Sequence, residues 1–226
     1  MMATEDWLAV RLSLWLAGVT TVILLVGCAP LAWWLAITKS RWKPLVEAVV
    51  SLPLVLPPTV LGFYLLIFLG PRGWLGGMWQ AWTGNPLSFT FTGLVIASVC
   101  YSLPFVTQPL QRAFEGVGRN VLEAAWTLGA SPWDGFWSVA VPLARHGFVT
   151  AGVLGFAHTL GEFGVVLMVG GNIPGQTQVI SVTIYEHVEN FSYARAHWLS
   201  MALLIFSLVA LVAVHWINRR VASGRA

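Results

Sequence analysis

Five long apolar windows constrain what this chain can fold into. A helix rises about 1.5 Å per residue and the hydrocarbon core of a bilayer is roughly 30 Å thick, so a spanning helix needs about 20 apolar residues. Five windows meet this requirement, at residues 12–37, 45–69, 89–110, 147–169 and 198–216. Only 9% of the residues are charged, so an ordinary water-facing surface could not be built. We predict an all-α membrane bundle, one domain over residues 1–226, with about five spans and six as the alternative.

The lysine and arginine residues alternate between connections, which predicts the orientation. Nine lie in the first loop, the third loop and the C-terminal tail: Lys39, Arg41, Lys43, Arg112, Arg119, Arg145, Arg219, Arg220 and Arg225. Three lie in the other connections: Arg11, Arg72 and Arg195. Cytoplasmic loops carry the excess of basic residues. We therefore expect the N-terminus outside and the C-terminus in the cytoplasm.

The remaining composition argues against several other classes of protein. The formal charge of +3 does not indicate a nucleic-acid partner, because the basic residues form short clusters between apolar runs. Cys28 and Cys100 both fall inside apolar windows, without the Cys/His spacing of a metal site. Neither Lys39 nor Lys43 follows a glycine, so the sequence has no P-loop for ATP. We expect no metal, no catalytic residue and no cofactor bound by this chain.

The long cytoplasmic segment of this topology, loop 112–145, contains signals for two short helices. Asn120 and Glu123 have the spacing of a capping box, and Gly129 suits a left-handed C-terminal cap. Ser131 can cap a second helix. One apolar face of that helix is predicted at Trp133, Phe136, Trp137 and Ala140. Either this apolar surface binds a partner, or it packs under its own bundle.

The same segment resembles a family motif. It reads Glu123-Ala124-Ala125, three residues, Gly129, nine residues, then Val139-Ala140-Val141-Pro142. This pattern resembles the EAA loop of the permease subunits of binding-protein-dependent ABC importers, whose usual ending is Ile-x-Leu-Pro. The resemblance implies that loop 112–145 docks on a separate cytoplasmic ATPase subunit, which binds the ATP and Mg. It also implies that the loop transmits closure of that subunit to the membrane helices.

The second window contains three prolines, Pro53, Pro57 and Pro58. Each removes a backbone donor and bends the helix, leaving carbonyls that neighbouring helices or water must satisfy. A broken span of this kind often lines a path through a membrane protein. A tolerated kink within a packed bundle is the alternative.

The fourth window contains His158 and Glu162, four residues apart and next to Gly161 and Gly164. On a continuous helix the two side chains would share one face. A charge at the bilayer centre costs about 2.5–3.5 kcal/mol on insertion scales, so an intramembrane Glu usually faces a protein interior or a water-filled path. We predict a gate or an interhelical contact at Glu162, and a neutral structural pair is the alternative.

An uncharged loop, residues 170–180, follows the fourth window and is external in the predicted topology. Asn172, Pro174 and Gly175 lie in it. Its backbone donors and hydroxyl groups could contact an oxyanion without trapping it. A plain turn explains the loop equally well.

Residues 52–185 as a whole resemble the permease subunits of molybdate importers, with sulfate and tungstate permeases as relatives. The resemblance is carried by the second-window prolines, by Gly161-Glu162-Phe163-Gly164 and by Asn172-Ile173-Pro174-Gly175. It implies a homodimeric pore in a bacterial or archaeal inner membrane, two ATPase subunits, an external oxyanion-binding protein, and molybdate as the transported ligand. A carboxylate repels an anion, so Glu162 is not assigned as its ligand.

Two other functions stay open on the sequence. Proton movement through Glu162 would make the chain a secondary oxyanion transporter, whose uptake would survive ATP depletion but collapse with the proton gradient. Acid-base chemistry by His158 and Glu162 would make it an intramembrane enzyme, although neither a nucleophile nor an HExxH motif accompanies them.

Overall fold

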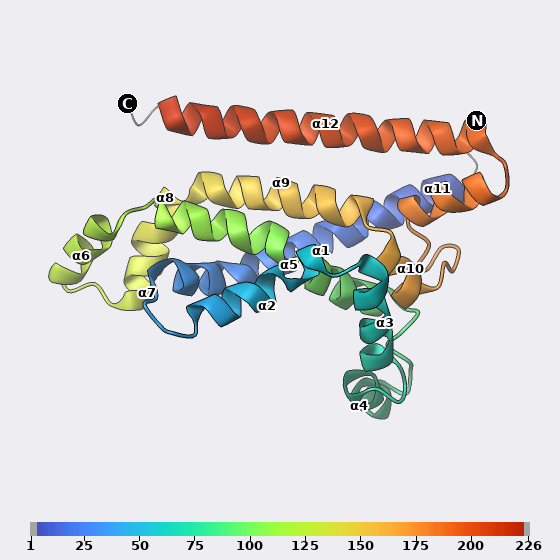
Figure 1. Cartoon of the computed structure of the whole chain (residues 1–226), viewed down its shortest axis with the longest axis horizontal. Helices are drawn as coiled ribbons and strands as arrows, with labels where there is room; N and C mark the ends of the chain where they lie inside the picture. The colour runs from blue at the N-terminus through green and yellow to red at the C-terminus, as the bar shows by residue number, and fades with distance from the viewer. Residues whose placement is uncertain (1–3, 224–226) are drawn as a thin grey trace.

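The computed structural model describes residues 4–223, and every regular element within them is helical (Figure 1). In chain order the elements are α1 (Thr4–Ile37), α2 (Lys43–Val55), α3 (Pro58–Leu69), α4 (Trp74–Thr83), α5 (Phe91–Glu115), α6 (Arg119–Thr127), α7 (Pro132–Asp134), the π-helical segment η1 (Gly135–Ala140), α8 (Val141–Leu143), α9 (Arg145–Gly161), α10 (Gly164–Gly170), α11 (Ile180–Glu189) and α12 (Tyr193–Ser223). The predicted all-α class is confirmed.

Helices α1, α5 and α9 pack against one another and form the centre of the bundle (Figure 1). Glycines allow α9 to approach α5 closely. A Cβ atom added to Gly147 would lie 2.1 Å from the Cβ of Ala113, and one added to Gly155 would lie 2.5 Å from Cγ2 of Val106. Lipid supplies no hydrophobic driving force between spanning helices, so close packing of small residues is what holds them together.

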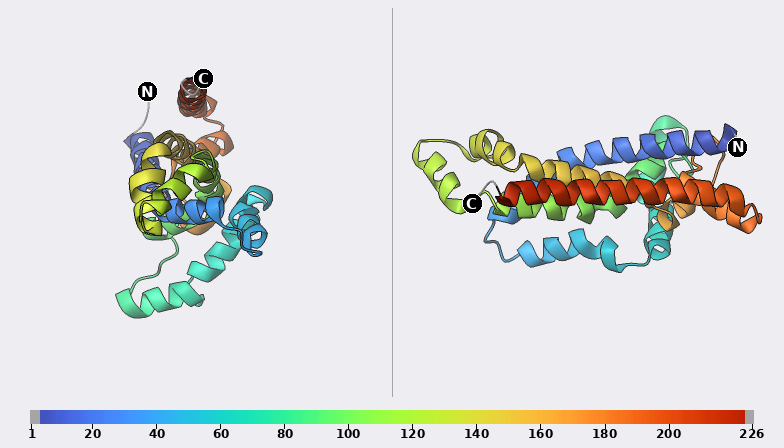
Figure 2. Two further views of the ribbon diagram at one scale, coloured as in Figure 1. Left: turned by 90° about the vertical axis from the view of Figure 1, so that its left-hand side faces the viewer. Right: turned by 90° about the horizontal axis from the view of Figure 1, so that it is seen from above.

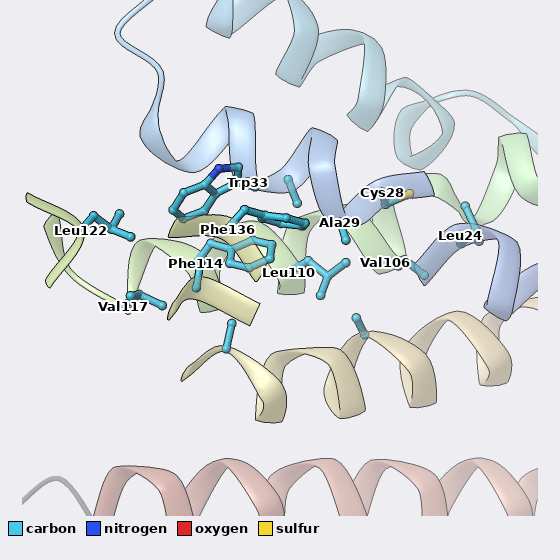
Figure 3. Close-up of a cluster of buried hydrophobic side chains, with 14 residues drawn as sticks. Leu24, Cys28, Ala29, Trp33, Val106, Leu110, Phe114, Val117, Leu122 and Phe136 are labelled. Atoms are coloured by element: carbon cyan, nitrogen blue, oxygen red, sulfur yellow. The ribbon is translucent and has the colours of Figure 1, made fainter. Parts of the chain in front are cut away.

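The buried side chains of this centre extend to the end of the bundle that carries loop 112–145 (Figure 3). They include Leu24, Cys28, Ala29 and Trp33 from α1, Val106, Leu110 and Phe114 from α5, and Phe136 from η1. The π-helical part of the loop is therefore part of the same core as the membrane helices.

Among residues 4–223, three helices are individually long and apolar enough to cross a membrane, namely α1, α5 and α12. Two further pairs of helices pass the same test together but are sharply bent. Helices α2 and α3 meet at 110°, and the segment Pro132–Leu143 meets α9 at 73°. Counting each pair as one span gives up to five, the number that the apolar windows predict.

Two of the predicted windows are interrupted. Helix α2 ends at Val55 because Pro57 and Pro58 have no N–H with which to continue it. Helix α3 then turns across the long axis of the bundle and leads to α4 (Figure 1). In the fourth window α9 ends at Gly161 and α10 begins at Gly164.

Helix α12 lies at the outside of the bundle (Figure 2). Only 11% of its most apolar window is buried, and it packs on α9 and α11. Because nearly all of its apolar surface remains uncovered by the rest of the chain, lipid or another chain must cover it.

One end of the bundle gathers the C-terminal ends of α1, α5 and α12 with the starts of α2 and α9 (Figure 1). The first loop, loop 112–145 and the C-terminal segment therefore meet there, as the predicted orientation requires. Arg11 and Arg195 lie toward the opposite end, and Arg72 lies between α3 and α4. Arg225 is outside the described residues.

We expect Gly147→Val to lower the melting temperature of the detergent-solubilised protein by about 5 °C, because overpacking a close helix contact costs about 1–3 kcal/mol. Gly18→Val is the matched control, since an added Cβ at Gly18 meets nothing within 4 Å. Differential scanning fluorimetry compares the two, and equal melting temperatures would contradict the role of the α5–α9 contact.

Candidate translocation path and coupling loop

The helix breaks at Glu162, in the middle of the fourth window. Helix α9 ends at Gly161, Glu162 is extended with φ −67° and ψ 131°, and α10 starts at Gly164. The main-chain oxygen of Glu162 accepts a hydrogen bond from Ser181 Oγ. The prediction that His158 and Glu162 share one helix face is wrong, because the helix ends between them.

His158 is fixed by α5. Its Nδ1 lies 2.9 Å from Ser102 Oγ, and the same hydroxyl lies 2.9 Å from Thr159 Oγ1. The imidazole stacks on Phe105 with 3.6 Å between ring centroids, and Tyr101 lies 4.9 Å away by the same measure. The side chain is therefore held in one orientation by a hydrogen bond and an aromatic stack.

Glu162 is buried without such support. Glu162 is only 3% exposed. Within residues 4–223, neither of its carboxylate oxygens makes a hydrogen bond of normal geometry. An ionised carboxylate buried without a partner is costly. In this conformation Glu162 lacks the hydrogen-bond partners that would stabilise a permanently ionised carboxylate.

His158 and Glu162 nevertheless line one cavity, of about 530 Å³, which we call the path cavity. Its wall is built from α3, α5 and the α9–α10 break: Pro58, Thr59, Tyr101, Ala157, His158, Gly161, Glu162, Phe163, Gly164, Leu167 and Met168. The start of α3 packs directly on the break, since a Cβ on Gly164 would lie 2.9 Å from the Cβ of Pro58. The structure thus brings Pro58 together with the fourth-window residues, whereas Pro53 and Pro57 do not line this cavity.

Sequence reasoning missed the residues that α5 contributes. Ser102 and Phe105 hold His158, and Tyr101 lines the path cavity. A single serine or aromatic residue in an apolar window has no distinctive pattern. The one available signal was Ser98 and Ser102, which are four residues apart and share a face of α5.

The predicted external loop is folded onto α11. Glu186 Oε2 accepts hydrogen bonds from Gln178 Nε2 at 2.7 Å and from Asn172 Nδ2 at 3.4 Å. Asn172 adopts φ 56°, and Pro174 and Gly175 are exposed at the tip. The loop is more than a plain turn, but its amide donors already face a carboxylate. Asn172, Pro174 and Gly175 do not line the path cavity.

The first helix of loop 112–145 begins at Arg119, two residues earlier than predicted. Its N-cap is Gly118 at φ 84°, with no side-chain cap hydrogen bond, so the capping role predicted for Asn120 is wrong. Glycine tolerates the left-handed backbone that turns the chain out of α5. Gly129 has φ 89°, as its predicted cap requires.

The second helix has the predicted start. Ser131 Oγ accepts a hydrogen bond from the Asp134 amide at 3.2 Å, and the Ser131 amide donates to Asp134 Oδ2 at 3.1 Å. The hydrogen bond from the Ser131 side chain, followed by that from its backbone, holds the pKa of Asp134 below its ordinary value. Pro142 does not end this helical segment, which continues to Leu143 and bends at Ala144.

The predicted apolar face is divided between two surroundings. Phe136 is 2% exposed and lies 5.9 Å from both Trp33 and Phe114 by ring centroids (Figure 3). Trp133 and Trp137 remain 64% and 63% exposed. The inner half therefore packs on its own bundle, and the outer half stays uncovered. The motif residues follow this division: Val139 and Val141 are half-buried, whereas Glu123, Ala124, Gly129 and Pro142 are exposed.

The sequence matches the family described as "Binding-protein-dependent transport system inner membrane component" over residues 29–224. The chain belongs to this family. It is a multi-pass inner membrane permease component of an ABC transporter and not an enzyme, because ATP hydrolysis is carried by a separate subunit. Loop 112–145 and both breaks lie within the matched residues.

Two relatives and one solved structure are similar to this chain over most of its length. The chain is 57% identical to a molybdenum transport system permease protein of Azotobacter vinelandii, over 99% of this chain and 98% of that protein. It is 34% identical to a probable sulfate transport system permease protein of Zygnema circumcarinatum, over 83% of this chain and 65% of that protein. A bacterial alginate ABC transporter, solved with a periplasmic protein, has the same fold, with a TM-score of 0.70, 19% identity, and coverage of 96% and 78%.

Ser131→Ala should lower the hydrogen-exchange protection of residues 134–137 about fivefold at neutral pH, because the helix loses its N-cap. The matched control is Ser138→Ala, an exposed serine of η1. A lowered pKa means that ionised Asp134 stabilises the folded segment above its ordinary pKa of 3.8. In the unsubstituted protein this protection should be lost as the pH falls below about 4. Equal protection in both serine variants would contradict the capping role.

Proposed function

We propose that this permease subunit moves molybdate across the inner membrane of a bacterium or archaeon, driven by a separate ATPase subunit. The observation that carries the proposal is 57% identity along 99% of the chain to a molybdenum transport permease. The sulfate relative is less similar and longer. Sulfate and tungstate are tetrahedral oxyanions of similar charge, so they are the alternatives that experiment must separate.

Its partners follow from this role. A permease that depends on a binding protein receives its ligand from an extracytoplasmic oxyanion-binding protein and its energy from the cytoplasmic ATPase. In the proposed orientation the N-terminus is outside and the C-terminus is cytoplasmic. The gathering of the basic connections at one end of the bundle supports this orientation.

A second copy of the chain completes the pore in this proposal. The path cavity has exposed residues on its α3 side, including Pro58 and Thr59. Further along the same broken span, Tyr64 is 63% exposed and Val55 is 82% exposed. Backbone that leaves a regular helix at membrane depth must be buried in protein or face a water-filled path. A homodimer would enclose the break between α2 and α3 within such a path.

Loop 112–145 has the form of a mechanical coupling element. Its outer half, with Leu128 at 90% exposure and the two exposed tryptophans, offers an apolar surface to the ATPase. Its inner half is held by Phe136 against Trp33 of α1 and Phe114 of α5. Force applied to the outer half therefore reaches the membrane helices through a packed aromatic cluster, which deforms little.

The break at Glu162 acts as the gate in this proposal. Glu162 is buried beside the path cavity, and its carboxylate would repel an anion when it is ionised. His158 is held by α5, and Gly164 is packed on Pro58 of α3. Movement of α3 or α5 would therefore change the surroundings of Glu162 directly, and Gly161 and Gly164 allow the backbone beside it to move.

We expect Gly129→Leu to insert into the membrane normally but to reduce ATP-dependent molybdate uptake at least about tenfold, because leucine strains a left-handed backbone on the docking surface. Gly84→Leu is the matched control, since Gly84 has φ 75° and Gly129 has φ 89°, and an added Cβ meets nothing within 4 Å at either position. Uptake is measured in proteoliposomes with the ATPase and the binding protein. Normal uptake in Gly129→Leu, or an equal loss in both variants, would contradict the coupling role.

Competition in the same proteoliposomes tests the ion. Tungstate should compete with labelled molybdate, and sulfate in large excess should not. Sulfate uptake as efficient as molybdate uptake would overturn the choice of ion while leaving the permease role intact. Uptake that survives ATP depletion and collapses with the proton gradient would instead favour a proton-coupled secondary transporter acting through Glu162.

A further inference from the structure

A second cavity lies away from the path cavity, between α5, α9 and α12, at the end of the bundle that carries loop 112–145. Its volume is about 360 Å³, and it shares no lining residue with the path cavity. We call it the interhelical cavity. Neither the coupling role nor the gate makes use of it.

The outer part of the interhelical cavity is polar and cationic. Arg112 and His146 line it, and no acidic residue is among its lining. Thr150 Oγ1 donates a hydrogen bond to Asn218 Oδ1 at 3.1 Å, which leaves the Asn218 amide nitrogen to donate elsewhere. The neighbouring Glu115 does not line the cavity and interacts instead with Gln111 at 3.1 Å and Lys43 at 3.9 Å. The guanidinium of Arg112 has no ion pair within residues 4–223, so this polar end favours an anion.

The inner part of the cavity is apolar. On all three helices a polar residue lies nearer the end of the bundle that carries loop 112–145, and an apolar residue lies deeper. The polar residues are Arg112 on α5, His146 on α9 and Asn218 on α12, and the deeper apolar residues are Pro109, Leu154 and Val214 on the same helices. Eight residues of α9 separate His146 from Leu154, a rise of about 12 Å. The cavity therefore matches an elongated ligand with an anionic end and an apolar body.

Helix α12, which forms one wall of this cavity, packs only sparsely on the rest of the chain. Only 11% of its most apolar window is buried, and the Thr150–Asn218 hydrogen bond joins it to α9 at this level. A ligand with an apolar chain would fill the space between α12 and the two central helices. It would also cover apolar surface of α12 that the rest of the chain leaves uncovered.

We propose that the interhelical cavity binds an anionic phospholipid of the cytoplasmic leaflet. The phosphate would lie at Arg112, His146 and Asn218, and the first part of an acyl chain would lie between Leu154 and Val214. Basic pockets between helices on the cytoplasmic side are suited to anionic headgroups. The leaflet rests on the orientation proposed above. A free phosphate ion would use only the outer half of the cavity, so a lipid fits it better.

The test is lipid binding to the purified permease–ATPase complex, measured by native mass spectrometry with phosphatidylglycerol and with phosphatidylcholine of the same chains. Phosphatidylglycerol should bind about tenfold more tightly, and Arg112→Gln should remove about that factor. Arg145→Gln is the matched control, because Arg145 is an exposed neighbour at the start of α9 that does not line the cavity. It should change the affinity less than about twofold.

A second variant, Leu154→Trp, fills the apolar part and keeps every charge. It should also weaken binding of phosphatidylglycerol, and inorganic phosphate in large excess should not displace the lipid. Equal binding of the two lipids, or equal effects of Arg112→Gln and Arg145→Gln, would overturn the proposal. Displacement by inorganic phosphate would overturn the assignment to a lipid. Lipid binding is read as mass, so its failure is distinguishable from a failure of molybdate uptake.

Discussion

The close contact of α5 with α9 is the interaction on which the rest of the structure depends. Gly147 and Gly155 of α9 leave room for Ala113 and Val106 of α5 and bring the two backbones together. In lipid such contacts replace the hydrophobic effect as the source of helix association. The path cavity, the aromatic cluster under loop 112–145 and the interhelical cavity all take part of their wall from this helix pair.

The irregular backbone of the chain lies around this closely packed helix pair. The bend between α2 and α3 and the break between α9 and α10 meet at the path cavity, where Gly164 packs on Pro58. Irregular backbone is tolerated at membrane depth only where protein or a water-filled path surrounds it. The two breaks therefore pack against each other at one place in the fold, where the proposed gate lies.

In the proposed mechanism, loop 112–145 joins this arrangement to the ATPase subunit. Its capping box and left-handed glycine fix the local shape, and Phe136 anchors it in the core of α1 and α5. Trp133 and Trp137, on the same short segment, are exposed and do not pack in that core. The alternative in which the face packs under its own bundle is confirmed for the inner half, and binding of a partner by the outer half stays a prediction. A period of 3.6 residues identifies an apolar surface without showing what covers each half of it.

The sequence by itself determined the all-α membrane class, the gathering of the basic connections at one end, and the local turns at Gly129 and Ser131. These depend on composition and on neighbours within a few residues. Only the tertiary structure decided that α9 ends before Glu162 and that Ser102 and Phe105 hold His158. It also decided that Glu186 accepts hydrogen bonds from the side-chain amides of Asn172 and Gln178. These depend on contacts between residues distant in sequence, whose free energies override local helix preference.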